Sequence, residues 1–274
     1  MRMQARAGMW GAARAMMGLA WRDRRLLVAV TRVELEKRYA GSAFGRVWLL
    51  LYPLILLAIY LFVYAVVFRM QLPGYQGLAY AAFVFCGLVP FIGLSESLST
   101  GTMCIKQNMH LVKNVMLPIE LVPMRAVLAS LATQVVGMAV LLVLLLITGQ
   151  ASLKLLLLPL VFALQVLMLI GLTFVLASLA VALTDVSYFV NLAIMLLMFV
   201  SPIGFTREMV PGPFAVLIDI NPVTYMIDAY RWVFLASYSE GYAPQAIFVV
   251  GALATFGLGA FFFQRFKGML VDYE

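Results

Sequence analysis

Residues 106–123, KQNMHLVKNVMLPIELVP, form a segment that is polar at one end and lies between two long apolar runs. Apolar residues dominate from Leu78 to about Leu98 before this segment and from about Ala126 to Ile147 after it. A helix needs roughly 20 apolar residues to cross the hydrocarbon core of a membrane, so each run is long enough for one crossing. The segment is therefore predicted to connect two membrane spans on one side of the bilayer.

The composition of the whole chain is that of an integral membrane protein. Of its 274 residues, 65% are hydrophobic and only 11% are charged, whereas soluble domains are about half apolar and a quarter charged. The apolar runs lack the period-two alternation of a membrane barrel, which predicts an all-α fold. The net charge of +7 is expected to face the cytoplasm rather than nucleic acid. Cys86, Cys104 and the single His110 indicate neither a disulfide framework nor a metal site.

Six membrane spans are predicted from the apolar runs. They cover about residues 47–68, 78–99, 126–148, 153–183, 188–205 and 247–263. The fourth run is too long for one upright crossing, so it is expected to tilt or to kink at Pro159. We expect a transmembrane domain over residues 47–267 and a separate N-terminal region over residues 1–46.

The N-terminal region divides into two predicted parts. Residues 1–20 contain arginines among small and apolar residues and lack the uninterrupted apolar stretch of a signal peptide, so we expect an uncleaved cytoplasmic arm. Residues 21–44 carry an apolar stripe and a basic face, which predicts an amphipathic helix in the plane of the membrane surface. A soluble helix packed on a partner is the alternative. Glu34 and Arg38 are spaced for an i,i+4 ion pair on this helix.

Residues 213–234 are predicted to form two short helices between the fifth and sixth spans. The apolar pieces 214–220 and 223–235 are separated by Asn221-Pro222, and neither is long enough to span. One continuous helix would place charged side chains in hydrocarbon, so we expect two re-entrant half-helices that return to the side they came from. Asp228 and Arg231 are spaced for an i,i+3 pair.

The distribution of basic residues predicts the orientation. With six spans, fifteen of the 19 Lys and Arg residues fall on the side that holds both termini and residues 106–123. Basic residues favour the cytoplasmic side, so we expect both termini and this segment in the cytoplasm and the half-helices on the outer side. A short charged helix tied to two spans on the cytoplasmic side is suited to receive a push from a cytoplasmic partner.

Four motifs give the chain a resemblance to a known family. They are RYAGSAFGRVW (38–48), NMHLVKNVMLPIELVP (108–123), SPIGF (201–205) and NPVTYMIDAYR (221–231). In this order and spacing the chain resembles the type-2 ABC exporter permeases, and within them the branch that exports O-antigen and related surface polysaccharides across the bacterial inner membrane. The resemblance runs from about residue 21 to the end.

The resemblance implies a homodimer of six-span subunits that works with two copies of a separate ATPase. The sequence agrees in one respect, because it contains no G-x-x-x-x-G-K-[ST] motif and no Gly-Lys dipeptide. We therefore expect no cofactor on this chain, with ATP and Mg bound by the partner ATPase. The resemblance implies a cytoplasmic coupling helix within residues 106–123, with its key positions at Asn108, Leu111, Val112, Lys113, Pro118, Glu120 and Pro123. It implies a cytoplasmic gate at Glu34, Arg38, Tyr39 and Trp48.

A polysaccharide path is expected to present aromatic faces, on which sugar rings stack. Tyr60 and Tyr64 lie on one face of the first span at i,i+4 spacing. The other candidates for this path are Phe199, Phe205, Tyr225, Tyr230 and Trp232. The alternative for each residue is packing inside the bundle or a place in an interfacial aromatic belt.

The predicted function is export of lipid-linked polysaccharide of the O-antigen type by an ATP-driven transporter, in which this chain is the channel subunit. A type-2 ABC permease for capsule, teichoic acid, lipid or drug is the nearer alternative. A carrier driven by an ion gradient is the more distant one, and its proton-carrying candidates are Glu96, Asp185, Asp219 and Asp228. An enzyme is disfavoured, because no histidine lies in a span to activate a serine there.

Overall fold

The computed structural model describes residues 8–70, 72, 74–110, 117–238 and 241–272. Within these residues the regular elements are helical, apart from the isolated bridges Leu72–Tyr75 and Ala151–Leu235. The long and short α-helices are α1 (Met9–Arg22), α2 (Arg24–Tyr39), α3 (Trp48–Leu61), α4 (Leu78–Thr102), α5 (Cys104–Gln107), α7 (Leu121–Thr148), α8 (Leu158–Ala182), α9 (Val186–Val200), α10 (Gly212–Ile220), α11 (Pro222–Phe234) and α12 (Ala243–Asp272). A π-helical turn, Phe62–Val67, extends α3, and short 3-10 helices occupy Gly45–Val47, Leu153–Leu157 and Arg207–Met209.

Five helical stretches among the described residues are long and apolar enough to cross a membrane. They are Gly45–Val67, Leu78–Thr102, Leu121–Thr148, Leu153–Ala182 and Ala243–Met269. The predicted fifth span instead forms α9, a helix of 15 residues, which is about 22 Å long and shorter than the hydrocarbon core. α9 ends where it does because Pro202 disfavours the helical conformation at Ser201, whose ψ is 140°.

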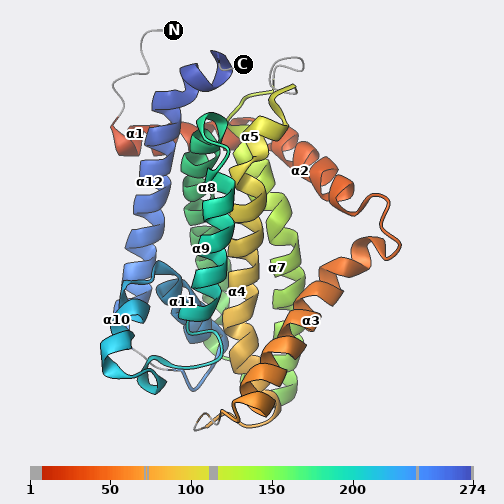
Figure 1. The fold of residues 1–274 in the computed structure, drawn as a ribbon, viewed down its shortest axis with the longest axis vertical. Coiled ribbons are helices and arrows are strands. Elements are labelled where there is room, and N and C mark those ends of the chain that lie inside the picture. Colours follow the sequence, from red (N-terminus) through yellow and green to blue (C-terminus); the bar gives the residue numbers. More distant parts are fainter. Residues whose placement is uncertain (1–7, 71, 73, 111–116, 239–240, 273–274) are drawn as a thin grey trace.

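The helices form one upright bundle with α4 at its centre (Figure 1). The span of α4 is 83% buried, compared with 17% for the span that contains α3. Small residues on α4 allow its neighbours to approach closely. A Cβ atom on Gly87, for example, would lie 3.2 Å from the Cα atom of Ile203. Glycines also let α8 and α12 pack closely where they cross, since a Cβ on Gly259 would lie 2.1 Å from the carbonyl oxygen of Gly171.

The two ends of the bundle carry different elements (Figure 1). We call the end that holds α1, α5 and the last turns of α12 the terminal end, and the end that holds α10 the far end. α2 and α3 converge on a corner at the side of the bundle. α10 and α11 form as two separate helices, and the break at Asn221 agrees with the sequence. The Asn221 side chain caps α11 by accepting a hydrogen bond of 2.9 Å from the Val223 amide.

The N-terminal region differs from its prediction. Residues Met9–Arg22, within and just after the predicted arm, form helix α1, which lies across the terminal end and packs against α12 (Figure 1). The predicted helix over 21–44 is interrupted at Asp23 and ends at Tyr39. Ala12, Ala13 and Met16 bury one face of α1, and these small and flexible side chains explain the close contact with α12.

Candidate functional site

The residues of the predicted coupling segment are only partly within the described structure. Leu111, Val112 and Lys113 lie outside the described residues. Asn108 ends α5, and its side-chain amide donates to the Cys104 carbonyl at 2.8 Å. The Pro118 carbonyl accepts from the Leu121 amide at 2.9 Å and so leads into α7, where Pro123 is buried in the first turn.

Glu120 faces the interior rather than an open surface. It is 5% exposed, and its carboxylate accepts a hydrogen bond from Lys267 near the end of α12. A buried carboxylate is stable when it is paired, because desolvation penalises an isolated charge. Glu120 therefore ties the start of α7 to the end of α12.

The predicted gate residues on α2 reach into the bundle through two long-range ion pairs. Arg38 Nη1 lies 2.9 Å from Glu96 Oε2 on α4, and Arg38 Nη2 donates to Ser130 Oγ on α7 at 2.9 Å. Glu34 Oε2 lies 3.6 Å from Arg125 Nη2, at the start of α7. The expected Glu34–Arg38 pair is wrong, because each residue has a partner in the bundle instead.

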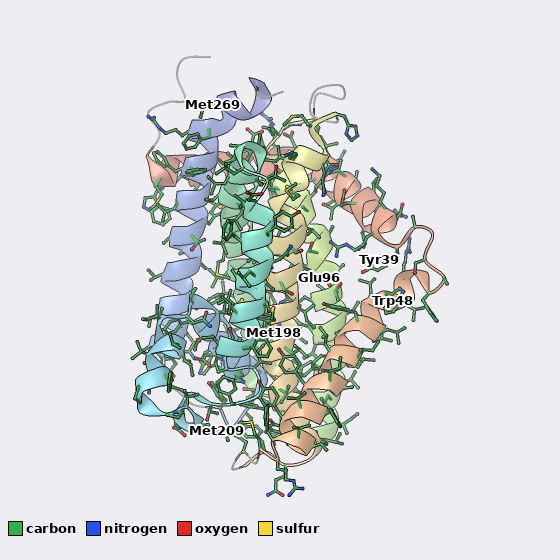
Figure 2. The ribbon with its side chains drawn as sticks, in the orientation of Figure 1. Tyr39, Trp48, Glu96, Met198, Met209 and Met269 are labelled. Atoms are coloured by element: carbon green, nitrogen blue, oxygen red, sulfur yellow. The ribbon has the colours of Figure 1, made fainter. Side chains whose placement is uncertain are left out.

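The Glu96 carboxylate has a second partner besides Arg38. It also accepts from Thr133 Oγ1 at 3.1 Å, while the Thr100 hydroxyl lies 2.7 Å from Ser130 Oγ. Figure 2 shows Glu96 on α4, at the level of the corner between α2 and α3, where Tyr39 and Trp48 lie. Tyr39 is half-buried. Trp48 is 37% exposed and packs edge-on against Phe44, with ring centroids 5.8 Å apart.

Three of the seven predicted path aromatics come together. Tyr60 and Tyr64 stack with ring centroids 5.8 Å apart, and Tyr64 lies 6.4 Å from Phe205. Gly204 permits this contact, since a Cβ there would lie 2.7 Å from the Tyr64 ring. Phe199 is 63% exposed on α9 and does not join the group.

Tyr230 is fully buried and belongs to a polar network in the bundle core. Its hydroxyl donates to Gln165 Oε1 at 2.5 Å and accepts from Gln134 Nε2 at 3.2 Å. The two glutamines also bond to each other, at 2.7 and 3.0 Å, and Gln165 donates to the Pro90 carbonyl at 3.0 Å. The network joins α4, α7, α8 and α11, so Tyr230 holds helices together rather than facing a path.

The remaining two aromatics lie toward the far end. The Tyr225 hydroxyl donates to the Asp219 carbonyl at 2.6 Å. The Lys154 ammonium lies over the Trp232 ring, 4.9 Å from the ring centroid. The rings of Trp232 and Tyr242 pack edge to face, with centroids 6.1 Å apart. Tyr225, Tyr230 and Trp232 thus occupy three different environments.

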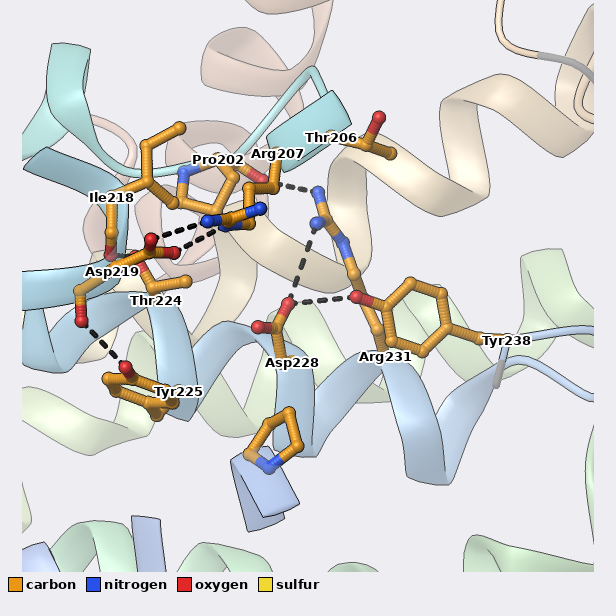
Figure 3. A pocket seen from close by; sticks show the side chains of 11 residues that line it. Pro202, Thr206, Arg207, Ile218, Asp219, Thr224, Tyr225, Asp228, Arg231 and Tyr238 are labelled. Atoms are coloured by element: carbon orange, nitrogen blue, oxygen red, sulfur yellow. Dashed lines mark hydrogen bonds and ion pairs between the residues drawn. The ribbon is translucent and has the colours of Figure 1, made fainter. Parts of the chain in front are cut away.

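A small cavity of about 120 Å³ lies beside α10 and α11 (Figure 3). Its lining includes Arg231, which is 1% exposed and donates to the carbonyls of Pro202 and of Ile203, the latter at 2.9 Å. Arg231 Nη1 lies 3.9 Å from Asp228 Oδ1, as the i,i+3 spacing predicted, and the Tyr238 hydroxyl donates to the same oxygen at 2.8 Å.

At the rim of the cavity, Arg207 makes two hydrogen bonds of 2.5 Å to Asp219. The nearby guanidinium holds the pKa of the Asp219 carboxyl below its usual value. Arg207 and Asp219 thereby fasten α10 to the loop that follows α9.

These contacts explain why two of the sequence motifs occur together. The Asn221 amide donates to Ser201 Oγ at 2.9 Å, and Arg231 binds the two carbonyls that follow Ser201. The segment 201–205 is therefore held by 221–231 through buried hydrogen bonds. Among the described residues, no group of three or more His, Cys, Asp or Glu side chains is placed to hold a metal ion.

A comparison with known families assigns the chain. The family model described as ABC-2 type transporter matches residues 25–235, well over half of the chain. The chain belongs to the ABC-2 type transporter family. It is 27% identical over 244 residues to an O-antigen export system permease protein RfbA of Klebsiella pneumoniae, covering 88% of this chain and 92% of the relative. It is 28% identical over 214 residues to the RfbA permease of Myxococcus xanthus, covering 77% and 80% respectively.

Membership of the ABC-2 family makes the chain a membrane subunit of an ABC transporter, and the family implies an ATPase partner. In this ABC-2 subunit, the sequence did not reveal which side chains the predicted site residues would contact. Arg125, Gln134 and Gln165 are buried polar residues in helices that are otherwise apolar. The polarity of Gln134 and Gln165 inside predicted spans was a usable signal, because intramembrane polar groups are expensive unless they are paired.

Proposed function

We propose that this ABC-2 family member is the channel-forming subunit of an ATP-driven exporter of lipid-linked polysaccharide of the O-antigen type. The observation that carries the proposal is the match, over most of both chains, to permeases named for O-antigen export. The glycan moves from the cytoplasmic side across the bacterial inner membrane. Lipid-linked substrate and membrane lipid are therefore its ligands, and nucleic acid is not.

The proposed topology has six spans with both termini in the cytoplasm. α9 serves as the fifth span together with residues 201–205, and α10 and α11 are the re-entrant half-helices of segment 213–234 on the outer side. The excess of basic residues at the terminal end supports this orientation. Residues 1–46 then form the cytoplasmic and interfacial region, and residues 47–267 form the transmembrane domain.

Two copies of the subunit form the proposed channel between them. α9 supports this, because it leaves a continuous row of large apolar side chains uncovered: Tyr188, Phe189, Leu192, Met195, Leu196 and Phe199 are each at least 54% exposed. The span that contains α3 is also mostly uncovered. We propose that α3 and α9 of two subunits face each other and that Phe199, Tyr60, Tyr64 and Phe205 lie beside the glycan path.

Two copies of a separate ATPase, which binds ATP and Mg, drive the proposed cycle through the coupling segment 106–123. Glu120 and Arg125 provide a physical route for the motion, since they connect the start of α7 to α12 and to α2. Movement of α2 would disturb the Arg38–Glu96 contact. The proposed entrance for the lipid-linked glycan is at Glu34, Arg38, Tyr39 and Trp48.

Purification from the native membrane in mild detergent tests the partner. A P-loop ATPase in equal amount is expected, and its absence after crosslinking would contradict the proposal. Replacing Leu111 and Val112 with Asp is expected to uncouple export from ATP hydrolysis while the subunit still inserts in the membrane. An added carbohydrate-binding domain on the ATPase would favour a glycan over a drug or simple lipid as the cargo.

Glu96→Gln separates the ATP-driven mechanism from the proton-driven carrier. Glutamine still offers an oxygen to Arg38 and Thr133, so an ATP-driven exporter is expected to retain its activity. A carrier that moves protons through Glu96 loses activity completely with this substitution. ATP-dependent export measured with the wild type and the variant side by side decides between the two.

A further inference from the structure

Helix α1 crosses α12 at the level where the apolar run of α12 ends. The Met9 side chain packs on Gly257, with Cγ 2.9 Å from the position that a Cβ would take. Further along α12, Gln264 Nε2 donates to the Ala12 carbonyl at 3.4 Å. Between these two contacts α12 is almost wholly apolar, and Gln264 and Arg265 then follow. A polar boundary at the end of a spanning helix marks the membrane surface, so α1 lies at that surface.

α1 has a second face, which none of the described residues covers. Trp10, Met17 and Trp21 are 55%, 47% and 73% exposed, and Arg14 is exposed between them. These four residues follow each other at spacings of three and four and form one stripe, which we call the Trp stripe. The stripe lies about a third of a turn away from the face that is buried against α12. Tryptophan, like tyrosine, is enriched in the headgroup region of membranes.

Positive charge surrounds the Trp stripe. Arg14, Arg22, Arg24 and Arg25 are exposed. Arg22 pairs with Asp23 at 3.1 Å, and Arg24 lies over the Trp21 ring at 4.9 Å from its centroid. Among the described residues, neither Arg14 nor Arg25 pairs with a carboxylate. Basic side chains next to a membrane surface attract anionic lipid headgroups.

We propose that α1 is a membrane-surface anchor whose Trp stripe binds the headgroups of anionic phospholipids. The family match begins at residue 25, so α1 lies outside the part of the chain that the family model describes. Only Asp23 separates α1 from α2. An anchored α1 therefore fixes the end of α12 and the start of α2 at the same membrane surface.

Tryptophan fluorescence of the subunit alone in lipid nanodiscs tests the anchor, without ATPase or transport. The sequence has four tryptophans, and Trp48→Phe with Trp232→Phe leaves Trp10 and Trp21 as reporters. We expect brominated phosphatidylglycerol to quench their emission and aqueous acrylamide to quench it little. Replacing phosphatidylcholine with phosphatidylglycerol is expected to shift the emission to shorter wavelength. As a check on the double variant, Trp10→Phe with Trp21→Phe in the otherwise natural chain is expected to reduce the bromolipid-sensitive emission to the part that Trp48 and Trp232 contribute.

The contribution of charge is tested with a matched pair of substitutions. Arg14→Gln is expected to reduce the difference between the two lipids, because Arg25 keeps part of the unpaired positive charge, whereas Arg69→Gln, at an exposed position at the far end, is expected to leave the difference unchanged. Strong quenching by acrylamide would mean that the stripe faces water. Shielding from both quenchers would mean that protein covers it, and equal behaviour in the two lipids would mean that headgroup charge plays no part. Each of these three results overturns the proposal.

Discussion

At the scale of single residues, Gly93 is a position where one added methyl group is expected to disturb a buried hydrogen-bond network. A Cβ there would lie 1.7 Å from Gln134 Oε1, so Gly93→Ala must displace this amide from Gln165 and Tyr230. Each buried hydrogen-bonding group left unsatisfied costs about 1–3 kcal/mol. We expect a loss of stability of that size, seen as a lower midpoint of thermal unfolding in detergent.

Gly251→Ala is the matched control for this substitution. Gly251 also lies within a spanning helix, but nothing approaches its missing Cβ within 4 Å. Its replacement is expected to leave the midpoint unchanged or slightly raised, because alanine favours a helix over glycine. Equal effects of the two substitutions would show that the glutamine network does not hold the bundle together.

Tyr230→Phe separates a structural role from a role in the glycan path. The hydroxyl is buried and bonded to the two glutamines, so its loss is expected to cost about 1 kcal/mol of stability. Export per folded molecule is expected to stay unchanged. A loss of export without any loss of stability, measured on the same preparation, would return Tyr230 to the path.

Spacing along one helix correctly predicted the contact between Asp228 and Arg231 but not the partners of Glu34 and Arg38. Asp228 and Arg231 meet as their i,i+3 spacing predicted, because both stand on α11. The exposed i,i+4 pair predicted for Glu34 and Arg38 is worth only about 0.3–0.5 kcal/mol. Partly buried partners replaced it, and Glu96 is 58 positions from Arg38. Such distant pairing depends on how helices pack, which spacing along one helix does not contain.

At the scale of elements, the contact between α7 and α12 predicts an asymmetric response to mutation. Lys267→Met leaves the Glu120 carboxylate buried without its partner, and breaking a buried ion pair in this way costs on the order of 3 kcal/mol. Glu120→Gln leaves Lys267, whose side chain is 42% exposed and can be solvated by water. We expect Lys267→Met to lower stability clearly more than Glu120→Gln.

The double variant completes the test of the α7–α12 contact. Combining Glu120→Gln with Lys267→Met removes both charges, so its stability is expected to exceed that of Lys267→Met alone. Chemical unfolding of all three variants in the same detergent measures the coupling. Additive losses would show that Glu120 and Lys267 do not act as a pair.

The lengths of the elements were predictable where apolar runs or turn residues mark them. The five long spans follow their apolar runs, and α10 and α11 separate at Asn221-Pro222 as expected. The fourth run begins as a 3-10 helix and becomes α-helical at Leu158, next to the predicted irregularity at Pro159. α1 was missed, because Gly11, Arg14 and Gly18 weaken its helical pattern and its stability comes from packing on α12.

At the scale of the whole molecule, the proposed dimer predicts which surface of the bundle meets a second copy. Leu192 on α9 and Leu258 on α12 are similarly exposed, at 54% and 58%. In a background with Cys86→Ala and Cys104→Ala, we expect Leu192→Cys to give crosslinked dimers in native membranes and Leu258→Cys to give few. Crosslinking through Leu258→Cys alone would place the interface on a different face.

Reconstitution of the subunit with its ATPase tests whether ATP drives the movement of a glycan. The subunit and the ATPase that purifies with it are placed in liposomes that carry lipid-linked O-antigen, and the glycan that reaches the opposite face is measured. We expect transport that requires hydrolysable ATP and stops when the ATPase is inactivated. Glycan movement that ignores ATP and follows an imposed proton gradient would contradict ATP-driven export.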